Sequence, residues 1–478
     1  MTEFKRNETN NAQKDPSADE LHGIDMSFQS ISIISKTILQ MENITTLILN
    51  NNDIREIPRE IYKLRKLEKL DLSHNKIEKI PPEVGKLINL KELLLNDNYI
   101  VDVPMEVGTL YKLENFDISN NPLKNPYGTM AKEKSLIRFC RENNTNYPPP
   151  NDRVWTETVF KPEVHCLSYT IGTFNTLCSH YASNLTYAPS WVINGECRKN
   201  VLLQSFLSVN MDILCLQEVD IGVYNSYYKE ALTNKMDYEG ILLPKKSYDP
   251  QNDQFKKLYG MAIFWKKKKF TFIEQINVDF YSKIINDKRF KYLSDVHNRF
   301  INKTNVSLIV ILESSKTVFI IVNVHLYYHP DYTDVKGMQT LILLEEVQKL
   351  KEKYGKESIV LLSGDFNSLK NSEVYEFITK RKLNPSIFGE FDYGSVTNGD
   401  YEHNMDFYDA YAEQELHFTN FTPSFCEVID YIFYSGPIKL FEVISPVEKE
   451  YTLKTIGLPN IHFPSDHVLI GAKFYIDK

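Results

Sequence analysis

The sequence lacks the long apolar runs that would place it in a membrane. No stretch approaches the roughly 18 apolar residues of a membrane-spanning helix. The first twenty residues are polar and charged, where a secretory signal peptide would be apolar. We therefore expect no membrane partner and predict a cytoplasmic protein, with a nuclear location left open.

Cysteine and basic charge are also scarce. The six cysteines contain no Cys-x-x-Cys pair, which argues against a structural zinc site or a redox dithiol and indicates free thiols in a reducing compartment. The formal net charge is −8, and residues 1–150 hold 20 lysines and arginines against 22 acidic residues. Without a broad positive field, any handling of nucleic acid must occur at a local site, with metal cations screening the phosphates.

What the sequence does contain, in its first third, is a repeat of 23 residues. Asparagine and proline recur at fixed places in the units: Asn52, Asn75, Asn98 and Asn121, and Pro58, Pro81 and Pro104. Around each asparagine the pattern is apolar-x-apolar-x-x-Asn-x-apolar, which resembles the leucine-rich repeat. In that repeat, short strands point leucines into a solenoid core and the asparagine bonds backbone groups at the bend. A partial unit precedes them at Ile34, Ile38, Met41, Ile44 and Leu47.

The end of the repeat region is marked by three consecutive prolines. A helix is expected over residues 131–143, and Pro148 to Pro150 cannot continue it. A chain of 478 residues is also too long for one core. We therefore predict a disordered tail at 1–29, a leucine-rich-repeat domain at 30–145, a Pro-containing linker at 146–160 and a second domain at 161–478.

The second domain is rich in short apolar runs. Runs such as "TVFIIVNVHL" and "SIVLLSGDFN" are nearly continuous, which indicates strands covered on both faces. Apolar residues at helical spacing predict a helix over residues 335–354, ended by Gly355. The predicted fold class is α/β, with a two-sheet sandwich flanked by helices after the solenoid.

Polar residues able to bind metal or phosphate stand at the ends of nearly all of these strands. One such residue alone is more often a solvated or hydrogen-bonded group. Strands that share a sheet can bring their ends to a common edge, so the set as a whole predicts one site. Its members are Asn175, Glu218, His325, Asp365, Asn367, Asp430 and the "PSDH" segment, which contains Asp466 and His467.

Asp365 and Asn367 form the most informative pair. Residues i and i+2 of an extended segment project to one side, so both side chains should point together while Phe366 enters the core. A carboxylate beside a carboxamide can hold a water molecule and accept its proton. This pair is therefore predicted to aim a nucleophilic water.

Six motifs in order, "TFNTL", "LQEV", "NVHL", "GDFNS", "IDYIFYS" and "PSDH", resemble the endonuclease/exonuclease/phosphatase superfamily, which shares the fold of pancreatic-type deoxyribonuclease. The strings "YAPSW", "HPDYTDVK" and "TNFTPSF" are similar to the mRNA deadenylases of that superfamily. Together with the repeat, they resemble the leucine-rich-repeat-bearing nuclease subunits of the CCR-NOT complex. The resemblance implies a repeat solenoid followed by a deoxyribonuclease-like sandwich.

The resemblance also implies a role for each site residue. Glu218, Asn175 and Asp466 match metal positions, and Asp365 and Asn367 match the pair that positions and deprotonates the attacking water. The remaining matches act on the phosphate (His467, oriented by Asp430, and His325) or contact adenine (Phe425, Pro330 and Asn420).

The activity implied is a 3′ to 5′ exoribonuclease that shortens poly(A) tails of mRNA and releases 5′-AMP. The implied cofactor is Mg2+, two ions, with Mn2+ as a substitute. The implied partners are poly(A) RNA and, through the repeats, a deadenylase of the DEDD type. Adenine stacking needs no basic groove, so the acidic balance is compatible with an RNA substrate.

Two alternatives remain open from the sequence. The same fold serves phosphodiesterases that act on 2′,5′-linked oligoadenylate, nicotinamide dinucleotides or inositol phosphates. A non-catalytic scaffold is the other alternative. A decayed site should have lost at least one of its main residues, and Glu218, Asp365, Asn367, Asp430 and His467 are all present.

Overall fold

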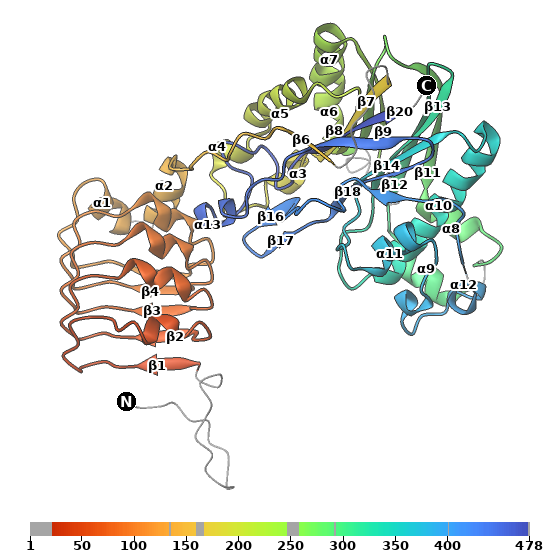
Figure 1. The fold of residues 1–478 in the computed structure, drawn as a ribbon. Coiled ribbons are helices and arrows are strands. Elements are labelled where there is room, and N and C mark those ends of the chain that lie inside the picture. The colour runs from red at the N-terminus through yellow and green to blue at the C-terminus, as the bar shows by residue number, and fades with distance from the viewer. Residues whose placement is uncertain are drawn as a thin grey trace. The chain divides into compact units, whose positions relative to one another are not determined.

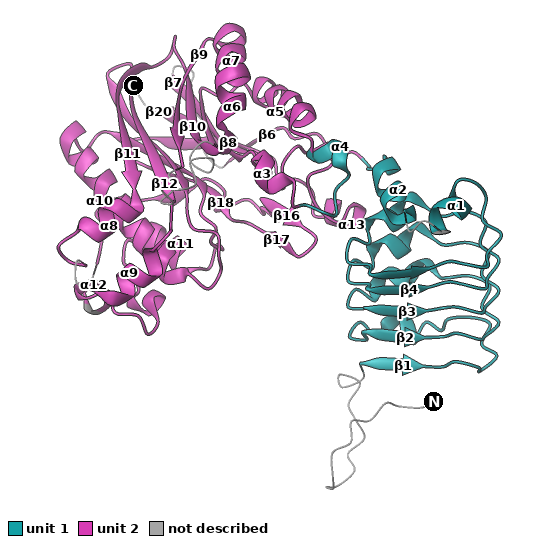
Figure 2. Cartoon of the chain, turned by 180° about the vertical axis from the view of Figure 1, so that it is seen from behind, with its two compact units in different colours: residues 1–148, 185–193 teal, residues 149–184, 194–478 magenta. Residues whose placement is uncertain are grey.

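The computed structural model describes residues 22–132, 135–158, 167–245, 258–290, 293–399 and 401–476. The chain divides into two compact units (Figure 2). Unit 1 contains the described residues up to Pro148 together with Leu185–Ile193, and unit 2 contains Pro149–Asn184 and the chain from Asn194 onward. The division falls inside the predicted linker. The segment 185–193, however, was expected in the second domain, and its packing assigns it to unit 1.

Unit 1 is a solenoid of short parallel strands (Figure 1). Consecutive strands pair residues 23 positions apart, as Leu47 pairs with Leu70 and Leu70 with Leu93. These leucines are fully buried. The strands are β1 (Gly23–Asp25), β2 (Thr46–Ile48), β3 (Lys69–Asp71), β4 (Glu92–Leu94) and β5 (Asn115–Asp117), and the 3-10 helices are η2 (Ile38–Gln40), η3 (Arg59–Lys63), η4 (Pro82–Lys86) and η5 (Met105–Thr109).

The repeated asparagines join successive units, as predicted. Asn75 accepts a hydrogen bond from the Ile54 amide at 3.0 Å and donates to the carbonyls of Leu49 and Leu72 at 2.9 and 3.1 Å. Asn98 repeats the arrangement one unit later. Each asparagine therefore satisfies buried backbone groups that the bend leaves without partners.

The solenoid begins earlier than the predicted boundary at residue 30, which is a correction to the expected tail. Strand β1 pairs with β2, and the Asn52 carboxamide accepts from the amides of Gln29 and Ile31 at 3.0 and 2.9 Å. Gln29 stands one period before Asn52, where the other units carry asparagine, so no asparagine marks this first unit. The part of the predicted tail before residue 22 lies outside the described residues.

Two helices replace the single one predicted over residues 131–143. They are α1 (Tyr127–Lys132) and α2 (Leu136–Asn143), and the Ser135 amide bonds to the Met130 carbonyl between them. Helix α2 closes the solenoid, because Cys140 is fully buried and the Arg141 side chain donates to the Gly108 carbonyl at 2.9 Å.

The segment 185–193 packs on α2. Its helix α4 (Ser190–Ile193) places the Trp191 indole N–H 3.0 Å from the Glu142 carbonyl, and the Ser190 hydroxyl donates to the Glu142 carboxylate at 2.6 Å. The rings of Tyr187 and Tyr111 lie 5.9 Å apart. No periodic signal in the sequence marks these contacts.

Unit 2 contains two large mixed sheets, as predicted. The seven-stranded sheet has the order β6-β19-β20-β7-β8-β10-β9 and the six-stranded sheet the order β11-β12-β13-β14-β18-β15. The first sheet consists of β6 (Trp155–Glu157), β7 (Leu167–Asn175), β8 (Ile213–Asp220), β9 (Tyr238–Pro244), β10 (Tyr259–Lys266), β19 (Lys439–Ile444) and β20 (Ile470–Ile476). The second consists of β11 (Thr271–Asp279), β12 (Val306–Ser314), β13 (Thr317–His325), β14 (Ile359–Asp365), β15 (Tyr408–Asp409) and β18 (Asp430–Ser435), and a hairpin adds β16 (Asn420–Thr422) and β17 (Phe425–Glu427).

The sheets pack face to face with helices outside. In β13, Phe319 and Ile321 join the core between the sheets, whereas Ile320 and Val322 join the core beneath the helices. This alternation explains why the strands read as continuous apolar runs.

The predicted helix over 335–354 is confirmed as α10 (Thr333–Tyr354). None of the described helices is long and apolar enough to span a bilayer. The other helices of this unit are α3 (Ser179–Ala182), α5 (Gly195–Val209), α6 (Ile221–Val223), η6 (Tyr224–Tyr228), α7 (Lys229–Met236), α8 (Phe280–Asn286), α9 (Ser294–Phe300), α11 (Glu373–Lys380), η8 (Pro385–Phe388), α12 (Ser395–Asn398) and α13 (Tyr451–Lys454).

Candidate active site

Three of the predicted residues lie in one row across the six-stranded sheet. His325 pairs with Asp365 across β13 and β14, and Asp365 pairs with Asp430 across β14 and β18. The strands approach closely here: a Cβ atom on Gly364, whose φ is +145°, would lie 2.0 Å from the Val324 carbonyl oxygen. Only glycine fits that position, which accounts for the "GDF" motif before the site.

Glu218 reaches the same place from the seven-stranded sheet through a β-bulge. Its strand β8 pairs Leu216 with Ala262 and Val219 with Gly260, so two residues face one at this point. Glu218 itself has a φ of +55°. A non-glycine residue in that conformation is strained by about 1–3 kcal/mol, and such strain is typical of side chains redirected at functional sites.

Asn175, the last residue of β7, links the two sheets. Its Nδ2 donates to Glu218 Oε1 at 3.3 Å and to Asp365 Oδ2 at 3.0 Å, and its Oδ1 accepts from the Leu177 amide at 3.0 Å. The carboxamide therefore fixes both carboxylates. Its predicted role as a metal ligand stays a prediction.

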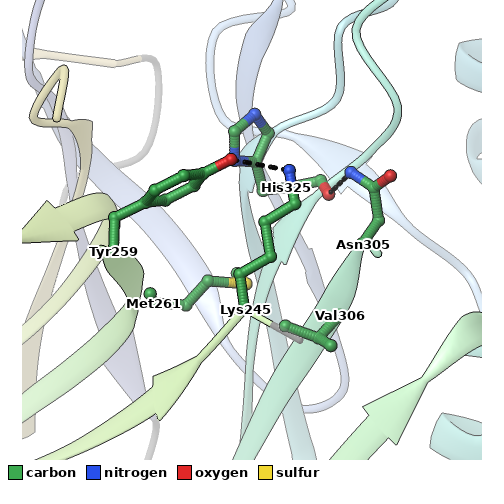
Figure 3. Close-up of a pocket in the computed structure, with 7 residues that line it drawn as sticks. Lys245, Tyr259, Met261, Asn305, Val306 and His325 are labelled. Carbon is green, nitrogen blue, oxygen red and sulfur yellow. Dashed lines mark hydrogen bonds between the residues drawn. The ribbon is translucent and has the colours of Figure 1, made fainter. Parts of the chain in front are cut away.

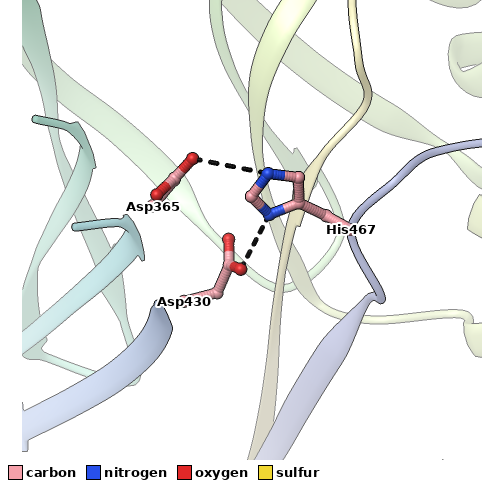
Figure 4. Close-up of side chains that lie close together, drawn as sticks. All are labelled: Asp365, Asp430 and His467. Carbon is pink, nitrogen blue, oxygen red and sulfur yellow. Dashed lines mark hydrogen bonds and ion pairs between the residues drawn. The ribbon is translucent and has the colours of Figure 1, made fainter. Parts of the chain in front are cut away.

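His467 completes the cluster from the loop before β20 (Figure 4). Its Nδ1 lies 2.8 Å from Asp430 Oδ2, and its Nε2 lies 3.7 Å from Asp365 Oδ2. The loop is tied to β7, because the Ser465 hydroxyl donates to the Asn175 carbonyl at 2.7 Å. Asp430, Asp365 and His467 are each almost completely buried.

The extended backbone predicted for Asp365 and Asn367 is wrong, although both side chains reach the same pocket. The chain turns after Asp365 instead of continuing as a strand: Asn367 has a φ of +47°, and its amide bonds to Asp365 Oδ1 at 2.9 Å. Asparagine tolerates this left-handed conformation. Phe366 is buried in the core, as predicted.

A pocket of about 570 Å³ collects the predicted side chains. Pro330, Phe425 and Asn420, the residues expected to contact adenine, all line it. Asn420 Nδ2 donates to Asp466 Oδ2 at 3.3 Å, which places the adenine side of the pocket next to the predicted metal residues. Of the eleven predicted residues, Asp430 alone does not line the pocket, because it lies behind His467.

Burial and mutual repulsion disfavour the charged form of the carboxylates in the site. Burial raises the pKa of Glu218, and the negative charge of Asp466 raises it further. Burial also raises the pKa of Asp365, with a second contribution from the charge of Asp430. Buried carboxylates that repel each other in this way are stabilised by a cation.

The two histidines have opposite charge states. Burial alone would lower the pKa of His467, but the charges of Asp430 and Asp365 outweigh it and raise the pKa well above its ordinary value. Burial and the positive charge of Lys245 lower the pKa of His325 to about 3. The site therefore offers a cationic imidazole beside a neutral one.

Lys245 and His325 both line a small cavity of about 10 Å³ (Figure 3). Lys245 Nζ donates to the Tyr259 hydroxyl at 2.7 Å, while Asn305 Nδ2 donates to the His325 carbonyl at 3.0 Å. These groups fix the backbone and the electrostatic surroundings of His325. Lys245 and Tyr259 were not predicted from the sequence.

A divalent cation fits this donor set. Glu218 and Asp466 line the pocket, and carboxylate oxygens are hard ligands that suit Mg2+ and Mn2+. Asp365, Asp430 and His467 also have ligand atoms within 4.8 Å of one another. Among the described residues, Asp430 Oδ1 is buried without a hydrogen-bond partner, which further shows unused acceptor capacity at the site.

Sequence reasoning missed the residues that support the site. Lys336 of α10 donates to the Asn367 carbonyl at 2.8 Å and lines the pocket. The Thr419 hydroxyl accepts from the Asp430 amide at 3.0 Å, and Gln217 bonds to Asn323 between the sheets at 2.7 Å. Only Gln217 and Asn323 had a signal, since polar residues interrupt apolar strands there.

Two family models match the chain. The model described as the endonuclease/exonuclease/phosphatase family matches residues 172–467, and a leucine-rich repeat region matches residues 28–148. The first match spans every predicted site residue.

Several relatives are similar over most of this chain. A protein of Enterocytozoon bieneusi, named as a probable CCR4-Not complex 3′-5′-exoribonuclease subunit Ccr4, is 61% identical over 99% of this chain and 98% of its own. Its counterpart in Vairimorpha ceranae is 48% identical over 99% of each. The Saccharomyces cerevisiae protein of that name is 39% identical over 96% of this chain and 59% of its own.

A solved structure resembles about two thirds of this chain. ANGEL2, described as a 2′,3′-cyclic phosphatase, covers 68% of this chain and 99% of its own with a TM-score of 0.55 and 21% identity. At that identity the likeness supports the sandwich fold alone.

Proposed function

Because this chain belongs to the endonuclease/exonuclease/phosphatase family, and within it to the CCR4-Not 3′-5′-exoribonuclease subunits, we propose that it shortens the poly(A) tails of mRNA from the 3′ end. The products are 5′-AMP and an RNA one nucleotide shorter. One observation carries the proposal: Glu218, Asp365 and His467 converge on a single pocket. Pro330 and Phe425 line the same pocket, where an adenine could stack.

The residues divide the hydrolysis among themselves. Asp365 accepts the proton of the attacking water, and Asn367 orients that water. The water oxygen bonds to the phosphorus of the terminal nucleotide while the bond from phosphorus to the preceding O3′ breaks, and that oxygen takes up a proton from solvent water. Cationic His467, held by Asp430, stabilises the charge on the phosphate oxygens, and neutral His325 adds a hydrogen bond.

Glu218 and Asp466, assisted by Asn175, are the residues that would hold Mg2+, with two ions proposed in the site and Mn2+ as a substitute. When bound, the cation supplies positive charge to the phosphate and lowers the pKa of a bound water. The raised pKa of Glu218 supports this assignment, since burial and the charge of Asp466 disfavour its charged form more than His467 and its hydrogen bonds to Cys178 and Asn175 favour it.

The experiment is a denaturing-gel time course on an RNA that ends in twenty adenines, with Mg2+ or with EDTA. We expect stepwise shortening that stops at the tail boundary, requires the metal and is lost in Asp365→Asn. An RNA ending in twenty cytosines should persist. Equal rates on both homopolymers would contradict the preference for adenine, and intact RNA in every lane would contradict the nuclease itself.

For the repeats, we propose docking onto a deadenylase of the DEDD type. The strands β2 to β4 present a row of side chains on one face, where Lys69 pairs with Glu92 at 2.6 Å beside the partly exposed Leu94. A pull-down with the full chain should recover that nuclease. Leu94→Glu should abolish recovery while Lys112→Glu should not, and recovery unaffected by Leu94→Glu would move the interface elsewhere.

We also propose that the protein is cytoplasmic, where mRNA tails are shortened, with a nuclear fraction as the second possibility. The absence of a membrane-spanning helix among the described residues is compatible with this. Fractionation of cells with an antibody to the chain tests it, and recovery with membranes would contradict it.

A further inference from the structure

The connection between β13 and α10 carries four rings in seven residues. Tyr327 lies 5.0 Å from Tyr328 and 5.1 Å from Tyr332, measured between ring centroids. His329 lies 5.9 Å from Tyr328 and 5.3 Å from Tyr332. We call Tyr327, Tyr328, His329 and Tyr332 the aromatic patch.

Two basic side chains support the patch. Lys303 Nζ lies 4.2 Å from the ring centre of Tyr327 and 4.3 Å from that of Tyr332, and it donates to the Tyr327 hydroxyl at 3.1 Å. The Arg299 guanidinium lies 3.8 Å from the Tyr332 ring and is held by Asp334 at 2.6 Å. These cation–π contacts fix the inner rings before any ligand arrives.

Tyr328 is the outer member of the patch. It is 67% exposed, although its ring contacts two neighbours. A large aromatic ring that stays exposed above rigidly held inner rings can stack on another flat ring. Stacking on such a ring is worth about 1–3 kcal/mol per base and accepts any base.

The patch is continuous with the active site. Tyr328 and Pro330 line the same pocket as Asp365 and His467, and the connection begins directly after His325. A strand whose terminal nucleotide occupies the pocket must pass its next nucleotides over the pocket rim. Basic Lys303 beside the rings suits the phosphates of such a strand.

We propose that the aromatic patch is a second RNA-binding subsite, in which Tyr328 stacks on a base on the 5′ side of the cleaved bond. The ligand is single-stranded RNA, and the subsite rests on the proposed exoribonuclease activity. It holds the chain in register between successive cleavages, independently of the contacts made by the terminal adenine.

The experiment pairs a tyrosine variant with a missing base. The substrates are an RNA of fifteen adenines and three derivatives with one abasic nucleotide at the second, third or fourth position from the 3′ end. The rate of release of the first nucleotide is measured with the full chain at subsaturating RNA. Tyr328→Ala should lower the rate on the intact RNA about tenfold, with the loss in KM rather than kcat.

The abasic derivative that removes the stacked base should lower the wild-type rate by a similar factor. On that derivative Tyr328→Ala should cause no further loss, because the two changes remove one interaction. Tyr328→Phe should keep the wild-type rate, since stacking needs the ring alone. Tyr408→Ala, which removes a ring 58% exposed elsewhere in unit 2, is the matched control and should leave the rate unchanged.

Losses that multiply at all three positions would overturn the subsite, because Tyr328 would then stack on none of the bases removed. So would a Tyr328→Ala rate equal to that of the wild type. If the wild type leaves the intact RNA uncut, the proposed function itself is overturned and the subsite with it. Thermal melting of each variant separates loss of the fold from loss of binding.

Discussion

At the scale of single residues, the site depends on charges that the fold alone disfavours. Glu218 combines a strained backbone with a buried carboxylate, and neither would persist unless the function required it. A cation that binds the folded state compensates for the repulsion between the buried carboxylates and adds stability by mass action. Stability and activity therefore conflict at this residue.

The first prediction concerns Glu218→Gln. A folded pKa above the unfolded value means that the metal-free protein loses stability as pH rises above about 4.5, the ordinary value for glutamate. The variant should remove that loss and raise the melting temperature at pH 8 in EDTA by about 2–4 °C. It should also lose the stabilisation by Mg2+ and reduce the cleavage rate at least about a hundredfold.

Scanning calorimetry with EDTA and with Mg2+ checks this prediction. Glu415→Gln, at a side chain 86% exposed, is the control and should behave as the wild type. A Glu218→Gln protein that still gains stability from Mg2+ would show that the cation is held by other residues.

A second residue predicts the opposite pH dependence. His403 is buried, its Nε2 donates to the Phe377 carbonyl at 2.9 Å, and its Nδ1 accepts from the Met405 amide at 3.3 Å. Burial lowers its pKa, so its contribution to stability is complete above about pH 6.5 and is lost as pH falls below that value. His403→Gln should flatten this loss.

Urea unfolding at pH 7.5 and at pH 5.5 measures the loss of unfolding free energy that His403 causes. The wild type should lose up to about 1.4 kcal/mol per pH unit through this group, and the variant should lose less. The exposed His297, replaced by Gln, is the control. Parallel losses in wild type and His403→Gln would assign the acid sensitivity to other groups.

At the scale of elements, the repeat is held by side chains that serve two units at once. Asn75 bonds the Ile54 amide and the Leu49 carbonyl of the preceding unit, and the Leu72 carbonyl of its own unit. The order of the strands therefore depends on a ladder of carboxamides as well as on leucine packing.

Asn75→Ala tests this ladder. Buried backbone groups left without partners cost about 1–3 kcal/mol each, so the repeats on both sides should open more easily. Amide hydrogen exchange by mass spectrometry should show faster exchange in peptides covering residues 46–100. Asn43→Ala, at an exposed asparagine whose side chain accepts from Lys66, should show no change, and equal exchange in both variants would contradict the ladder.

Features that repeat or alternate could be predicted from the sequence, whereas features set by a single tertiary contact could not. The asparagine period predicted the solenoid, and the polar residues at strand ends predicted the site, because paired strands bring their ends to one edge, as His325 and Asp365 show. The turn at Asn367 and the role of Lys336 depend on neighbours distant in sequence. They leave no local pattern to detect.

At the scale of the whole molecule, the chain order and the packing order differ. Residues 185–193 follow the start of the sandwich in sequence but pack in unit 1, where Trp191 and Ser190 bond to Glu142. Tyr187 and Val192 are nearly buried there. Neither unit is therefore a single contiguous stretch of the sequence.

A chain that begins at Pro149 should accordingly associate. It would retain Tyr187, Trp191 and Val192 without the residues of unit 1 that cover them, and exposed apolar side chains promote aggregation. Size-exclusion chromatography should show a reduced monomer fraction compared with the full chain. Tyr187→Ser combined with Trp191→Ser should restore the monomer, and a monomeric unmodified fragment would contradict the expectation.

The same segment has a consequence during translation. Domains usually fold from the N-terminus as they leave the ribosome. The surface of α2, however, is covered by residues 185–193, which are synthesised only after β7 of the next unit. The solenoid can assemble its early repeats at once and close its last face only when residue 193 has emerged. A ribosome that stalls before residue 185 would thus hold a nascent chain whose solenoid has an uncovered last face. Chaperones are expected to bind such a face.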